Sequence, residues 1–146
     1  MDKRLQEAIW ALAKARDEGL LDAEDSSALF VSWDTLDGYL SHLSNAFDRP
    51  NIRHSIAVKT QPHPAVLRHI ATQGFGLEAA SLEEVKLAEQ ADAPFIVFDS
   101  PVKRPSEIDY CQNLGRPLLL NVNCLFRATD FTCWESDMAI SVVSSL

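Results

Sequence analysis

The sequence of 146 residues predicts an α/β fold with a parallel β-sheet, and two features of the chain lead to this prediction. From residue 55 onward, short apolar runs alternate with longer stretches whose apolar residues recur at helical spacing. The apolar runs are nearly continuous, which is typical of parallel strands that are covered on both faces. Strands and helices that alternate in this way build a parallel sheet, either open or closed into a barrel.

Two helices and one strand are expected before this alternation begins. Apolar residues at helical spacing predict a helix over residues 3–18, and Gly19 is a suitable end for it. The run ALFVSW predicts a strand over residues 28–33. Asp34 is expected to cap the helix that follows. The apolar stripe of this second helix comprises Leu36, Leu40, Leu43 and Phe47.

The alternating part then supplies most of the predicted sheet. Strands are expected over residues 55–58, 76–80, 94–99 and 117–122, with a further candidate over residues 138–143. Helices are expected over residues 64–73, 81–91 and 105–114. Ser81 and Glu84 have the spacing of a capping box, and Gly115 is suited to end the third helix.

The composition excludes several classes of protein. The net charge of −8 argues against nucleic-acid binding, which needs clustered lysines and arginines. No apolar run is long enough to span a membrane, and the charged N-terminus lacks the pattern of a secretory signal, so a cytoplasmic location is predicted. Three widely spaced cysteines fit neither a disulfide framework nor a zinc site, and no metal is expected. They are Cys111, Cys124 and Cys133.

Polar residues follow four successive strands of the predicted sheet, where ligands of parallel α/β proteins bind. They are Lys59, the segment Glu78–Ser81, the segment Asp99–Lys103 and the segment Asn121–Cys124. Lys59 could be a lysine that has simply reached solvent, or an amine held for chemistry. Glu78 could bind a ligand, or it could stabilise the start of the helix near Ser81.

The order of motifs from residue 28 to 131 resembles the fold-type III pyridoxal-phosphate decarboxylases, the family of ornithine, diaminopimelate and arginine decarboxylases. Their lysine segment reads Ala-Val-Lys-Ala/Cys-Asn, and here it reads Ala57-Val58-Lys59-Thr60-Gln61. A Gly-Phe-Asp-x-x-Ser strand and a helix with a glutamate follow in the family. The later segments IVFDSPVKRPSEIDYC and LLLNVNCLFRATDF, and the earlier FVSWDTLDGYLSHL, resemble further strands and helices of these enzymes.

The resemblance implies a barrel of the alanine racemase-like type, a (β/α)8 TIM barrel that takes about 250 residues when complete. Four to five parallel strands are therefore expected to form its N-terminal half, over residues 28–146, after a helical extension over residues 1–27. The family's Gly-rich phosphate loop, the acidic residue that faces the pyridine nitrogen, the stacking histidine and the second β-rich domain are not found in this sequence. The chain is accordingly expected to be a truncated product, a fragment or an excerpted domain.

The resemblance also implies a function. Lys59 would form the Schiff base with pyridoxal 5'-phosphate, and Glu78 would lie near this cofactor. A lysine amine attacks an aldehyde when it is neutral, which a dry site beside other cations favours. The implied reaction is decarboxylation of an amino acid of the ornithine or diaminopimelate type, by an enzyme that forms homodimers. The 146-residue chain alone is not expected to be active.

Three departures and two alternatives accompany this hypothesis. Gln61 stands for the usual asparagine, Glu78 for an aspartate, and Asn123-Cys124 for Asp-Ser. One alternative is a pyridoxal-phosphate-dependent racemase or a small homeostasis protein that binds the same cofactor. The other is a degenerate paralogue without catalysis, whose partial barrel binds another subunit.

Overall fold

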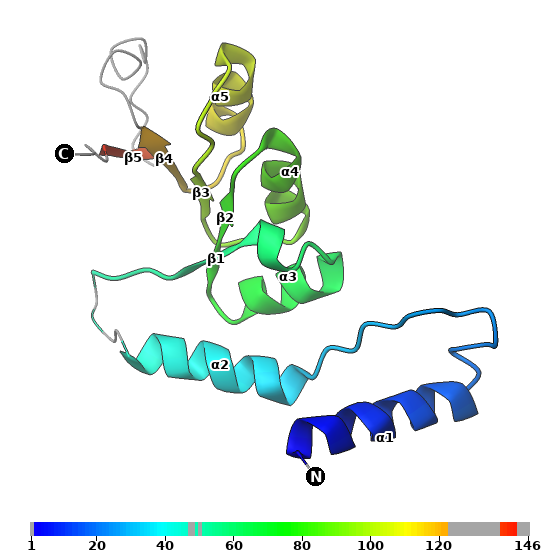
Figure 1. The fold of residues 1–146 in the computed structure, drawn as a ribbon. Helices are drawn as coiled ribbons and strands as arrows, with labels where there is room; N and C mark the ends of the chain where they lie inside the picture. Colours follow the sequence, from blue (N-terminus) through cyan, green and yellow to red (C-terminus); the bar gives the residue numbers. More distant parts are fainter. Residues whose placement is uncertain (1, 47–48, 50, 123–137, 143–146) are drawn as a thin grey trace. The chain divides into compact units, whose positions relative to one another are not determined.

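A computed structural model describes residues 2–46, 49, 51–122 and 138–142 of the protein (Figure 1). The chain forms two compact units, Met1–Leu43 and Ser44–Leu146. The predicted domain boundary after residue 27 stays a prediction. Within the described ranges, no helix has both the length and the apolar character that a membrane span requires.

The first unit begins with the predicted helix. Helix α1 covers Lys3–Asp17, and the side chain of Asp2 caps it by accepting a hydrogen bond of 3.0 Å from the Arg4 N–H. Gly19 follows the helix with a φ of 69°, a conformation that glycine adopts without strain. The prediction of a helix that stops at Gly19 is therefore confirmed.

The predicted strand over residues 28–33 is wrong. Residues 25–32 belong to neither a helix nor a strand, and Leu29 is 77% exposed. A strand needs hydrogen bonds to a neighbouring strand, and none of the described strands pairs with this segment. Its apolar composition alone was therefore insufficient to predict its conformation.

Helix α2 covers Trp33–Ala46 and starts earlier than the sequence predicts. Its capping residue is Ser32 rather than Asp34, because the Ser32 hydroxyl accepts a hydrogen bond of 3.3 Å from the Thr35 N–H. Asp34 lies instead in the first turn, where a negative charge favours the helix dipole. Of the predicted stripe, Leu40 is buried, Leu36 and Leu43 are half-buried, and Phe47 lies outside the described residues.

The second unit contains a five-stranded sheet in which every pair of neighbours is parallel. The strand order follows the chain, β1-β2-β3-β4-β5. The strands are β1 (Ser55–Ala57), β2 (Gly76–Ala79), β3 (Ile96–Phe98), β4 (Leu118–Val122) and β5 (Met138–Val142). Each predicted strand from residue 55 onward is confirmed within one or two residues of its bounds, and residue 143 lies outside the described residues.

Helices join the first four strands. They are α3 (Pro64–Thr72), α4 (Leu82–Gln90) and α5 (Pro105–Gln112), and all three lie on the same side of the strands in Figure 1. Parallel strands in chain order, each followed by a helix on the outside, have the arrangement of successive units in a (β/α)8 barrel. The predicted α/β architecture is thus confirmed.

The two faces of the sheet differ in burial. One face packs against the helices, and its residues in register are buried in two rows. These rows are Leu77, Ile96 and Leu118, and then Ala79, Phe98 and Leu120. The other face carries the half-buried row Ala57, Glu78, Val97 and Leu119 and is called the open face below. The core of this unit therefore lies between the sheet and its helices.

The start of α4 confirms the predicted cap with one variation. The Ser81 hydroxyl accepts a hydrogen bond of 3.2 Å from the Glu84 N–H. The Glu84 carboxylate reaches back to the Ala80 N–H, at 2.7 Å, one residue earlier than a standard capping box. The hydrogen bond to Ser81 satisfies one N–H group that the helix leaves unpaired, and the one to Glu84 satisfies the N–H of the residue before the cap.

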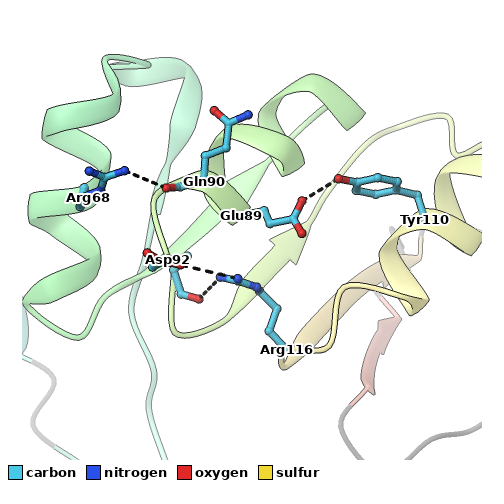
Figure 2. Close-up of polar contacts among 7 residues, drawn as sticks. Arg68, Glu89, Gln90, Asp92, Tyr110 and Arg116 are labelled. Carbon is cyan, nitrogen blue, oxygen red and sulfur yellow. Dashed lines mark hydrogen bonds and ion pairs between the residues drawn. The ribbon is translucent and has the colours of Figure 1, made fainter.

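Side chains also connect neighbouring helices and turns on the outside of the sheet (Figure 2). Arg68 of α3 donates to the carbonyl of Gln90 at 3.3 Å, and Tyr110 of α5 donates to the Glu89 carboxylate at 2.6 Å. The hydrogen bond to Glu89 is the main reason why the pKa of Tyr110 is raised. In the turns, Arg116 donates to the Ala93 carbonyl at 3.0 Å and approaches Asp92 at 4.0 Å.

Cys111 is expected to be unreactive in the folded protein. Its side chain is 2% exposed, and burial raises the pKa of the thiol to about 12. Because the thiolate is the nucleophile, iodoacetamide at pH 8 should alkylate Cys111 only after the protein is unfolded in urea. Peptide mapping by mass spectrometry measures this, and equal labelling with and without urea would contradict the buried position.

The same shift of the pKa gives a pH dependence for stability. The folded-state value lies above the ordinary value of 9.0, so the neutral thiol stabilises the fold fully below pH 9. This contribution is lost as the pH rises from about 9 to about 12. The free energy of unfolding of Cys111→Ala should therefore depend less on pH in this range than that of the wild-type chain.

Candidate functional site

The carboxyl ends of the strands bring polar side chains together on the open face. Glu78 lies on this face in β2, and Asp99 follows β3 two residues after Val97. The Asp99 N–H still donates to the Ala79 carbonyl at 2.9 Å, so the alternation of the strand continues and places Asp99 on the open face as well. Asn121 stands two residues after Leu119 in β4, on the same face. Ligands of parallel α/β sheets bind at this end.

Lys59 follows β1 within a short 3-10 helix, η1 (Val58–Thr60). The turn is held by the Thr60 hydroxyl, which donates to the Ala57 carbonyl at 2.7 Å, and by the Gln61 N–H, which donates to the Val58 carbonyl at 3.2 Å. Val58 is fully buried, whereas Lys59 is exposed, so the described residues do not give Lys59 the dry surroundings that a reactive lysine was expected to have. The structure therefore places an accessible amine at the end of β1 on a turn anchored by its neighbours.

The polar turn after Lys59 leads directly into α3. The Gln61 side-chain oxygen accepts a hydrogen bond of 3.3 Å from the His63 N–H. His63 in turn caps α3, because its Nδ1 accepts from the Ala65 N–H at 3.3 Å, and Pro64 occupies the first helical position. Pro64 and the His63 cap thus begin α3 a few residues after β1 ends, so the segment that carries Lys59 is short.

Glu78 lies in register with Ala57 of β1 and Val97 of β3, and its side chain is half-buried. The N–H groups of Ala80 and Glu84 at the start of α4 bond to Glu84 and Ser81, so neither binds Glu78. Glu78 and Lys59 belong to adjacent strand ends, but no hydrogen bond or ion pair joins them among the described residues.

Asp99 and Asn121 form a direct contact that the sequence did not reveal. The Asn121 Nδ2 donates to Asp99 Oδ1 at 2.7 Å and thereby joins the end of β3 to β4. The Asn121 Oδ1 is buried and has no hydrogen-bond partner among the described residues. A buried acceptor without a partner costs about 1–3 kcal/mol, so this atom calls for an explanation.

Lys103 is buried at the same rim, with 8% of its surface exposed. Its ammonium donates to the main-chain carbonyls of Ser100 at 2.5 Å and Asn121 at 2.6 Å. It also lies 5.3 Å from the centre of the Phe98 ring, within the range of a cation–π contact. Lys103 therefore ties the loop after β3 to β4.

These contacts show which part of the site sequence reasoning missed. Asp99 and Asn121 were expected near the rim, but their hydrogen bond depends on the register of β3 and β4. The sequence did contain one signal for this pair: Asp99 and Asn121 stand two residues after Val97 and Leu119 respectively, a spacing that puts both on the same face of the sheet.

Asn123 and Cys124 lie outside the described residues. No cluster of three metal-binding side chains occurs in the described part of the chain.

Comparisons with known proteins agree on one family. Residues 36–125 match the family model described as the pyridoxal binding domain of pyridoxal-dependent decarboxylases. The lysine/ornithine decarboxylase of Vibrio vulnificus in complex with putrescine is 26% identical, with a TM-score of 0.62. Its complex with cadaverine is also 26% identical, with a TM-score of 0.60.

The matched regions cover most of this chain but a minor part of the solved structures. Each match spans 75% of this chain and 30% of the decarboxylase chain. The predicted partial barrel of the alanine racemase-like type is confirmed by this likeness and by the parallel strand order. The cofactor of the matched domain is pyridoxal 5'-phosphate. The chain belongs to the pyridoxal-dependent decarboxylase family, and its residues 36–125 match the family's pyridoxal-binding domain.

Proposed function

We propose that this chain is the cofactor-binding part of a decarboxylase that acts on a basic or diamino acid, and that Lys59 is its Schiff-base lysine. The observation that carries the proposal is the position of Lys59, an exposed amine at the end of β1 inside the matched region 36–125. The substrate class is supported by the similar lysine/ornithine decarboxylase, whose structures hold putrescine and cadaverine.

The described residues fit one part of pyridoxal 5'-phosphate well. The cofactor has an aldehyde, which needs an accessible amine, and a ring with N–H and O–H groups, which need acceptors. Lys59 supplies the amine, and the half-buried carboxylates of Glu78 and Asp99 supply acceptors on the open face. The phosphate needs donors, but the ammonium of Lys103 is directed to two carbonyls, and no glycine cluster that could hold a phosphate occurs in the described residues.

Each of these residues has a role in the proposal. Lys59 would hold the cofactor through its aldehyde carbon, and Glu78 would set the local charge beside it. Val97 and Leu119, on the same face, would limit access of water. When bound, the cofactor supplies an electron sink for the electron pair left on the substrate when carbon dioxide departs. A cytoplasmic homodimer with an amino-acid substrate belongs to the same proposal.

The two alternative functions stand differently. The family model and both matched structures are decarboxylases, so nothing favours a racemase or a small homeostasis protein. A paralogue without catalysis would keep the fold but would have no need for a reactive amine at Lys59. Labelling of the lysines with pyridoxal 5'-phosphate, described in the next paragraph, separates this alternative from the proposed function.

Pyridoxal 5'-phosphate followed by borohydride reduction should label Lys59 specifically. Lys59 is exposed at the rim, whereas Lys103 is buried with its ammonium bonded to two carbonyls and should remain unlabelled. Mass spectrometry of peptides locates the adduct, which should disappear in Lys59→Ala. The matched control is Lys86→Ala, an exposed lysine of α4 on the outside of the sheet. Labelling spread evenly over the exposed lysines would overturn the proposal.

A further inference from the structure

A cavity of about 370 Å³ lies at the N-terminal ends of β1, β2 and β3, at the edge of the sheet opposite to Lys59. Arg53 and His54 line it just before β1, Phe75 just before β2 and Phe95 just before β3. Because neighbouring strands are parallel, their N-terminal ends meet at one edge and their carboxyl ends at the other. The cavity is therefore separate from the rim that carries Lys59, and its volume falls within the range of about 300–1,000 Å³ that is usual for small-molecule sites.

Two phenylalanine rings give the cavity an apolar lining. Phe75 is buried, and its ring centre lies 6.0 Å from that of His54. Phe95 is half-buried, and its ring lies so close to the backbone of Gly76 that a Cβ atom there would collide with it. The absence of a side chain at Gly76 thus leaves the room that the Phe95 ring occupies.

The side chain of Arg53 brings a positive charge to this lining. Its guanidinium lies 5.7 Å from the centre of the Phe95 ring, within the range of a cation–π contact. Arg53 is exposed, and in the described parts of the chain no residue forms a hydrogen bond or an ion pair with its side chain. None of the described residues that line the cavity is an aspartate or a glutamate, although the chain has 21 of them. The N–H groups of Arg53 are therefore available to an anionic ligand.

We propose that this cavity binds a small organic anion, in which a carboxylate or phosphate group is attached to a flat apolar body. A guanidinium binds either group through two parallel hydrogen bonds, so Arg53 would hold the anionic end. The apolar body would contact the rings of Phe75 and Phe95. The contact of Arg53 with Phe95 holds the guanidinium before a ligand arrives, which lowers the entropy lost on binding. A diamine would find no carboxylate among the described lining residues and should be excluded.

The cavity is independent of the proposed function. The four residues of β2 separate it from the rim by about 13 Å, since a strand rises about 3.3 Å per residue. A ligand in the cavity would consequently leave Lys59 accessible to pyridoxal 5'-phosphate. Labelling of Lys59 therefore tests the proposed function, whereas titration with small anions tests the cavity.

The 146-residue chain, labelled with an NMR-active nitrogen isotope, is titrated with benzoate and with phenyl phosphate while its amide signals are recorded by NMR spectroscopy. Benzylammonium serves as the cationic counterpart, and inorganic phosphate as the anion without an apolar body. The amides of Gly74, which lines the cavity, and of Gly76, beside the Phe95 ring, report on binding. Both organic anions have about ten heavy atoms and should bind with dissociation constants in the millimolar range.

Arg53→Gln should weaken binding of the anionic probe that binds by about tenfold, because hydrogen bonds to a charged group are worth that much in affinity. Arg53 is exposed, so the substitution should leave the fold intact. The matched control is Arg68→Gln, the same change at an exposed arginine of α3 that bonds to the Gln90 carbonyl and does not line the cavity. The affinities of this control should stay within about twofold of those of the wild-type chain.

Binding of phenyl phosphate without benzoate would assign the cavity to organic phosphates, and the converse result would assign it to carboxylates. Four results would overturn the inference. They are an absence of shifts at Gly74 and Gly76 with both organic anions, binding of benzylammonium as tight as that of the anions, binding of inorganic phosphate as tight as that of the organic anions, and affinities of Arg53→Gln within about twofold of those of Arg68→Gln.

Discussion

Truncation of Phe98 to alanine should lower the free energy of unfolding by about 3–5 kcal/mol, the range measured for large aromatic residues in protein cores. Phe98 has no exposed surface and is among the largest fully buried side chains of the second unit. It lies in register between Ala79 of β2 and Leu120 of β4, on the face that packs against the helices. Removal of the ring leaves a cavity in the core, and it also removes the contact with the Lys103 ammonium.

Urea denaturation followed by far-UV circular dichroism measures this loss. The control is Val97→Ala, the preceding residue of β3, whose half-buried side chain lies on the open face. The control should cost less than half as much, since fewer atoms leave a packed environment. Equal losses for the two variants would contradict the assignment of the core to the helix-covered face.

The sheet of the second unit could be predicted from the sequence because its strands and helices are indicated by patterns among nearby residues. Continuous apolar runs predicted the strands, and the polar interruptions between them contain the residues that start and end the helices. Ser81 and Glu84 show this, because both participate in capping α4, as their spacing of three residues predicted. The same local reasoning placed Lys59 and Glu78 at adjacent strand ends.

Features that depend on partners far along the chain were not accessible in the same way. The segment 28–33 has the composition of a strand but pairs with no described strand. The sequence placed Lys103 only within the polar segment Asp99–Lys103 after a strand and did not predict its burial. Carbonyls of Ser100 and Asn121, one of them 18 residues away, both accept from its ammonium. Such contacts follow from the register of β3 and β4, which a single sequence does not specify.

The Lys103→Met variant should be destabilised by about 2–3 kcal/mol. Methionine keeps a side chain of similar length but cannot donate, so the buried carbonyl of Ser100 and the carbonyl of Asn121 lose a charged donor. Because methionine is uncharged, the variant avoids the free-energy cost of burying an ammonium, and this offsets part of the loss. The loss of two short charge-assisted bonds outweighs this gain, since such bonds contribute about 1.5–3 kcal/mol each.

The comparison for this prediction is Lys86→Met, the same chemical change at an exposed position of α4. The Lys86 ammonium lies 5.6 Å from the centre of the Tyr110 ring, a surface contact worth about 0.5–1 kcal/mol. Thermal unfolding and urea denaturation of both variants give the two free energies. If Lys103→Met costs no more than Lys86→Met, Lys103 does not hold β4 in place.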